Sequence, residues 1–152
     1  MEREKLRIEC GVREIEVNDD GECIYIPMDD NTFFKRVDNF LNWLEERQAT
    51  LEKEGESRPK LEDDTPEAKL DMIKEAVELQ ARLSDEVCTE LDKLFGEGCC
   101  RKVFVGVQSP SIVLIWDFLD KLRPYLQKFA RERNEKINLM YNRNRKAARG
   151  TL

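Results

Sequence analysis

Apolar residues recur through most of this chain every three or four positions, which is the period of a helix with one buried face. The first such stripe predicts a helix over about residues 31–52, ended by Gly55 and Pro59. The second predicts a helix over about residues 66–95, because Thr65 is a good N-cap and a proline follows it at the first helical position.

The second helix has a predicted buried face that begins at Leu70, Ile73 and Val77. Its near-heptad rhythm indicates packing along another helix. The polar residues 53–64 that precede it follow neither a helical nor a strand period. This polar stretch therefore predicts an exposed loop between the first two helices.

A third apolar stripe predicts a helix over about residues 110–141. Ser109 and Pro110 repeat the cap-then-proline pattern of the second helix start. Pro124 interrupts the stripe and removes a backbone hydrogen bond, so a kink or a break is expected there. Residues 142–152 are basic and polar, and we predict that they form a disordered tail.

The first part of the chain, residues 5–26, alternates between apolar and charged residues and predicts two or three short strands. The run from Asn18 to Gly21 is typical of a hairpin turn. The predicted fold class is mainly α (α+β). A short N-terminal β-hairpin or small sheet precedes three principal helices, and residues 1–141 form a single domain.

The composition argues against catalysis. The chain has no histidine, so it lacks the commonest general base and the commonest metal ligand. Its acidic residues lie in turns and loops, where N-capping and solubility explain them better than acid–base chemistry does. We therefore expect a protein that is not an enzyme and that uses no cofactor.

The cysteines number five, and an odd count without a disulfide framework predicts reduced thiols in a cytoplasm. Cys99 and Cys100 are adjacent in sequence and lack the spacing of a zinc site, so small buried or half-exposed thiols are favoured over a redox or metal role. The longest apolar stretch, from Ile112 to Trp116, is too short to span a bilayer, and we expect no membrane association.

The net charge is −6, but it is unevenly distributed. From Lys128 to Leu152 the chain has eight basic and two acidic residues, so the rest of the chain is strongly acidic. A basic end of this kind suits a nucleic-acid-binding regulator. The acidic body would repel a phosphate backbone, however, so a solvated helix end or a segment that folds onto an acidic protein partner is favoured, and nucleic acid is a weaker alternative.

The most apolar region of this polar chain lies around the start of the third predicted helix. Such a stripe usually belongs to the core. If the small body leaves it uncovered, a partner protein should cover it. The candidate partner-binding residues are Phe104, Val105, Val107, Ile112, Ile115, Trp116 and Leu119, together with the basic residues Arg143, Arg145 and Arg149.

Three consecutive features resemble the tail assembly chaperones of siphophages that infect Firmicutes. They are the Leu-Asp-Lys-Leu-Phe-Gly-Glu-Gly turn at residues 91–98, a connector with Lys102, Phe104 and Gly106, and a helix from Ser109. The asparagine- and arginine-rich end at residues 142–149 is also similar to that family.

The resemblance implies a protein of the infected host's cytoplasm that coats the tape measure protein and helps tail tube protein assemble around it. It implies no cofactor and no active site. Reversible protein binding through exposed apolar surface suits such a role, and many weak copies can hold one long partner by avidity. A structural adaptor of another assembly stays open as an alternative, and so does a homo-oligomer.

Overall fold

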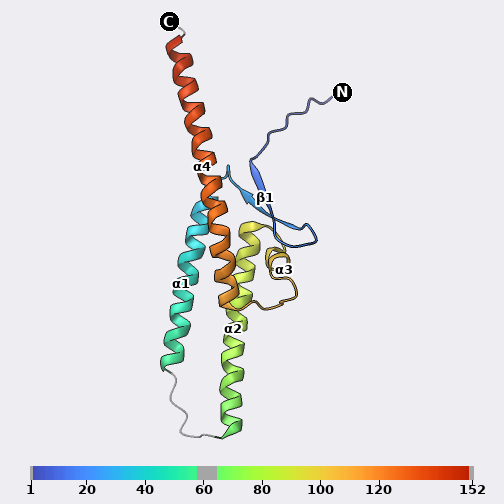
Figure 1. Ribbon diagram of the computed structural model, residues 1–152, viewed down its shortest axis with the longest axis vertical. Helices are drawn as coiled ribbons and strands as arrows, with labels where there is room; N and C mark the ends of the chain where they lie inside the picture. The colour runs from blue at the N-terminus through green and yellow to red at the C-terminus, as the bar shows by residue number, and fades with distance from the viewer. Residues whose placement is uncertain (1, 58–64, 151–152) are drawn as a thin grey trace.

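The computed structural model describes residues 2–57 and 65–150. It is an α+β structure in which a two-stranded antiparallel sheet precedes the helices, as the sequence predicts (Figure 1). The elements in chain order are β1 (Val12–Glu16), β2 (Cys23–Pro27), α1 (Phe33–Ser57), α2 (Pro66–Phe95), the short α3 (Cys99–Val103) and α4 (Ile112–Gly150).

The hairpin of β1 and β2 closes through the predicted turn. The backbone N–H of Val17 donates to the carbonyl of Glu22 at 2.9 Å, and the Asn18 side chain accepts from two backbone N–H groups of the turn. Ile24 and Ile26 of β2 are buried against the helices. A marginal two-stranded sheet gains its stability from such docking.

A third strand does not form within the described part of the chain, although residues 5–10 alternate as a strand would. Leu6 and Ile8 are 89% and 76% exposed, and residues 2–11 have no regular structure. The alternation shows that one face of this segment is apolar. Without a helix beneath it, that face has no core to enter.

The core lies where α1, α2 and α4 run side by side in the middle of the molecule (Figure 1). Phe33 and Leu44 from α1, Leu91 and Phe95 from α2, and Ile115 from α4 are all at most 1% exposed. The two ends of the molecule are thinner: the first half of α2 has α1 beside it but not α4, and α4 projects beyond the body at the opposite end.

The first helix is longer than predicted. α1 continues through Gly55 to Ser57, whereas the sequence predicts an end near residue 52. An interior glycine costs a helix only about 1 kcal/mol relative to alanine, and the neighbouring Glu and Lys residues are good helix formers. Residues 53–57 of the predicted loop are therefore helical, and residues 58–64 lie outside the described residues.

The boundaries of α2 agree with the prediction. The Thr65 hydroxyl oxygen accepts a hydrogen bond from the backbone N–H of Ala68 at 3.3 Å. Gly96 ends the helix at φ +105°, in the positive-φ region that glycine adopts without a steric penalty, and its N–H donates to the carbonyl of Asp92.

The predicted connector at residues 99–108 contains one turn of helix, α3. The next helix starts later than predicted, at Ile112. The hydroxyl of Ser111, not that of Ser109, accepts from the backbone N–H of Leu114 at 3.3 Å. Both serines are chemically able to cap, and the helix begins after the second of them, beyond the buried Pro110.

The last helix corrects the predicted disorder of residues 142–152. α4 passes Pro124 without a break and extends to Gly150, while residues 151–152 lie outside the described residues. A helix already nucleated in the body extends at little cost through Lys, Arg and Ala. A kink at Pro124 stays a prediction.

None of the helices in the described ranges combines the length and apolarity needed to cross a bilayer.

Candidate protein-binding surface

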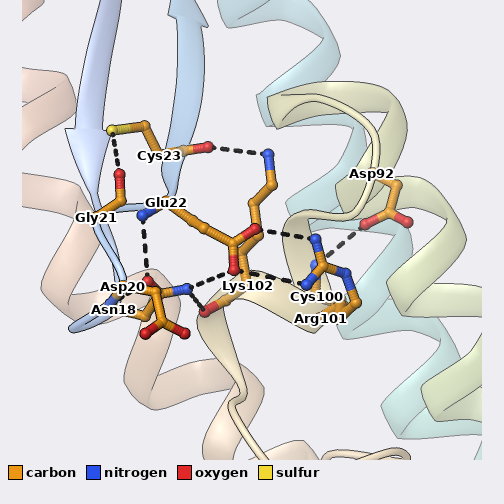
Figure 2. Close-up of polar contacts among 9 residues, drawn as sticks. All are labelled: Asn18, Asp20, Gly21, Glu22, Cys23, Asp92, Cys100, Arg101 and Lys102. Carbon is orange, nitrogen blue, oxygen red and sulfur yellow. Dashed lines mark hydrogen bonds and ion pairs between the residues drawn. The ribbon is translucent and has the colours of Figure 1, made fainter.

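A set of polar contacts holds α3 against the hairpin (Figure 2). The guanidinium of Arg101 donates to the carboxylate of Glu22 at 3.0 Å. The Asn18 amide donates to the carbonyl of Lys102 at 3.1 Å, and the Lys102 ammonium donates to the carbonyl of Cys23 at 3.2 Å. These bonds fix the residues that follow α3 beside the edge of the sheet.

A further bond ties α3 to α2. The backbone N–H of Cys100 donates to the Asp92 carboxylate at 3.1 Å (Figure 2). The hydrogen bond from Arg101 lowers the pKa of Glu22 below its ordinary value of 4.5. The ionised form of Glu22 is therefore the one that the folded protein favours.

An apolar groove lies between the hairpin, residues 103–107 and the first half of α4, and we call it the connector groove. Its volume is about 570 Å³. Phe104 lies beneath it and is 8% exposed, whereas Val105 and Val107 are 66% and 41% exposed. Its lining residues include Ile15, Val17, Ile24, Phe104, Val105, Val107, Leu114, Phe118, Leu122 and Tyr125, with Asp117 and Lys121 among the polar ones.

Most of the candidate binding residues on α4 pack in the core. Ile115 and Leu119 are 1% and 8% exposed, and Ile112 is half-buried. The indole N–H of Trp116 donates to the Gln48 side-chain oxygen at 3.0 Å, which joins α4 to α1. The folded chain therefore does not present these four side chains together with Val105 and Val107 as one surface.

Leu114 and Tyr125 are two exposed apolar residues of the connector groove on α4 that were not among the predicted binding residues. They are 39% and 49% exposed and lie off the principal apolar stripe of α4. A second, weaker apolar face on the same helix is the signal that could have identified them. The main stripe obscured it because both faces are rich in leucine and aromatic residues.

A second groove, of about 670 Å³, lies between α1, α2 and the first turn of α4, and we call it the bundle-end groove. Leu51, Ala81 and Ile112 are among its lining residues.

The prediction that the first half of α2 is buried is wrong. Three of its apolar residues are 52–60% exposed: Leu70, Ile73 and Val77. The reason is that α4 runs from the bundle-end groove toward the opposite end of the molecule, so it does not lie along the first turns of α2 (Figure 1).

The projecting end of α4 carries the other candidate residues. Arg143 and Arg145 are exposed, and the Arg145 guanidinium lies 5.7 Å from the centre of the Tyr141 ring. The side chain of Arg149 lies outside the described residues. This basic end lies away from the connector groove, so the predicted binding residues fall on two separate surfaces (Figure 1).

The adjacent cysteines are buried, as predicted for small structural thiols. Burial raises the pKa of the Cys99 thiol to about 12, and the Asp92 carboxylate contributes to this shift. A hydrogen bond with Cys88 and burial raise the pKa of the Cys100 thiol as well. Within the described ranges no cluster of three or more cysteine or carboxylate side chains is arranged to hold a metal ion.

Comparison with known protein families identifies the family of this chain. The profile of a family of unknown function, DUF6673, matches residues 20–151, which is most of the chain. The chain belongs to DUF6673. The DUF6673 match takes in β2 and every helix, while β1 lies before it. No curated protein and no solved structure matches the chain.

Proposed function

We propose that this protein works by reversible binding of another protein through the connector groove, and that it is a phage tail assembly chaperone whose partner is the tape measure protein. The observation that carries the binding part is the exposed apolar patch at that groove. Val105, Val107, Leu114 and Tyr125 are between 39% and 66% exposed beside one another.

The form of the groove favours an amphipathic helix as its occupant. An apolar helix face can lie along α4 against the valines, while Asp117 and Lys121 offer charged contacts at the exposed edge. Polar contacts hold the groove in place before binding, because α3 is bonded both to the hairpin and to α2. A preorganised groove loses less conformational entropy on binding.

The tape measure protein as partner comes from the family resemblance around residues 91–106. A tape measure protein is long and helical, so it offers many similar sites in a row. A groove of this size suits modest affinity per copy, and several copies along one partner would hold it by avidity. The body's acidic character would keep such a complex dispersed.

The test is co-expression with the tape measure protein of the same genome. We expect a soluble complex that survives gel filtration. The variant V105E/V107E places two charges in the groove and should abolish the complex, because an unpaired charge is costly in an apolar contact. Leu6→Glu is the matched control, since Leu6 is 89% exposed and is not among the residues that line the groove.

Two results would contradict the proposal. One is a tape measure protein that stays insoluble and forms no complex with the unaltered chain. The other is equal loss of the complex with Leu6→Glu and with V105E/V107E. Circular dichroism of each variant confirms that the helices remain.

A further inference from the structure

The projecting end of α4 continues the face that the same helix buries in the core. Ile137 and Met140 lie 11 positions after Leu126 and Phe129, which is three helical turns, so each pair points the same way. Leu126 and Phe129 pack in the core, while Ile137 and Met140 are 49% and 57% exposed. This face therefore continues past the last element of the body that could cover it.

The first half of α2, at the opposite end of the molecule, also exposes an apolar face that the same helix buries in the core. Ile73 and Val77 lie 18 positions, or five turns, before the buried Leu91 and Phe95. Both are more than half exposed, and the bundle-end groove runs beside them. On the other sides of that groove, α1 contributes Leu51 and the start of α4 contributes Ile112, whereas Ile73 lies outside the groove lining.

The end of α4 extends well beyond the body. Its last polar contacts to the body, among the described residues, are the ion pair of Arg13 with Glu132 and the hydrogen bond of Arg133 with Asn31. The 17 residues that follow, 134–150, form about 25 Å of helix, which is long enough to cover the face of α2 that carries Ile73 and Val77.

The charges of the two segments are complementary. Residues 134–147 carry four basic residues and one acidic residue, and every side chain among them is exposed. The facing parts of α1 and α2, residues 45–54 and 66–80, carry eight acidic and four basic residues. Like-charge repulsion therefore does not oppose contact between the two ends, and opposite charges favour it.

We propose that the α4 end of a second copy of this chain packs on the α1–α2 end and completes a three-helix bundle there. Ile137, Met140 and Tyr141 of one copy would cover Ile73 and Val77 of the other. The chain's own α4 contributes only its first turn to the bundle-end groove, because it is one continuous helix that leaves at the opposite end of the molecule (Figure 1).

This contact uses surfaces other than the connector groove, so it does not depend on the proposed chaperone function. The contact joins different patches of the two copies, which is a heterologous interface. Such an interface produces an open chain unless the geometry closes it into a pair or a ring.

The experiment is sedimentation equilibrium of the full chain over a range of concentrations. We expect a mass of at least twice the monomer's 17.9 kDa at the higher concentrations. Ile137→Asp and Ile73→Asp should each weaken association by about tenfold or more, because each puts a charge in the apolar contact. The matched control is Leu139→Asp, since Leu139 is 70% exposed on the opposite face of α4.

Mixing the two weakened variants supplies an independent check. Ile137→Asp keeps an intact α1–α2 end, and Ile73→Asp keeps an intact α4 end. One complementary contact therefore survives in the mixture, and we expect a species of twice the monomer mass that neither variant forms alone. A structural defect common to both variants could not produce that recovery.

Three outcomes would overturn the proposal. The first is a monomeric mass for the unaltered chain at every concentration. The second is equal weakening by Leu139→Asp. The third is salt-sensitive binding of duplex DNA that R143E/R145E abolishes while the mass of the protein is unchanged, which would assign the basic end to nucleic acid.

Discussion

At the residue scale, the cysteines show how burial decides chemistry. Cys10 is exposed, whereas Cys99 and Cys100 are 1% and 8% exposed inside the core. The sequence shows that the two cysteines are adjacent but not how deeply their side chains are buried, so it left a redox role open. The thiolate is the reactive form, and burial near the Asp92 carboxylate disfavours it at Cys99 more than the Lys102 ammonium favours it.

We predict that alkylation distinguishes these thiols. With a pKa of about 12, the Cys99 thiol has almost no thiolate at pH 8 and is also shielded from a reagent, whereas Cys10 is exposed to it. Iodoacetamide should therefore modify Cys10 in the folded protein and reach Cys99 only after unfolding in guanidinium. Peptide mass mapping measures each site, and equal rates at Cys10 and Cys99 in the folded protein would contradict this account.

At the element scale, α2 is one regular helix with two different halves. Its second half packs in the core, and its first half presents the same apolar face to solvent. Periodicity alone cannot separate the halves, because it reports the direction of an apolar face and not the length of the neighbouring helix. The caps at Thr65 and Gly96, by contrast, depend on local chemistry and were predictable.

The two halves should respond differently to the same substitution. Leu91 is fully buried, so Leu91→Ala should lower the free energy of unfolding by about 2–5 kcal/mol. Leu70 is 52% exposed, and Leu70→Ala should change it by less than about 0.5 kcal/mol at low protein concentration. Urea unfolding measures both, and similar losses for the two variants would show that the first half of α2 is covered.

At the scale of the whole molecule, the hairpin and the helices form one body through contacts far apart in sequence. Glu22 and Arg101 are 79 positions apart, and Lys102 reaches the backbone of β2 over the same separation. No local sequence pattern predicts such pairs. The sequence predicted a hairpin before the helices, but the partner side chains and the connector groove that they position come from the tertiary structure.

The contribution of Glu22 should depend on pH. Its pKa is lower in the folded chain than its ordinary value of 4.5, so the ionised form stabilises the fold above that value. This contribution is lost as the pH falls through the folded-state pKa. We therefore expect Glu22→Gln to lower the melting temperature slightly at pH 7 and to leave it unchanged in strong acid.

Two variants control this measurement. Arg101→Gln removes the partner and should reproduce the loss at pH 7. Glu14→Gln removes an exposed carboxylate of β1 and should leave the melting temperature unaffected. A difference between Glu22→Gln and the unaltered chain that persists unchanged into strong acid would show that the ion pair is not its source.

The sequence by itself determined the fold class, the hairpin turn, the ends of α2 and the existence of three long helices. Each of these follows from interactions within a few residues, namely caps, turn residues and helical period. Only the tertiary structure decided where the apolar faces are covered. Coverage depends on where a distant helix begins and ends, so α4 buries Ile115 and Leu119 yet leaves Val77 of α2 and its own Ile137 exposed.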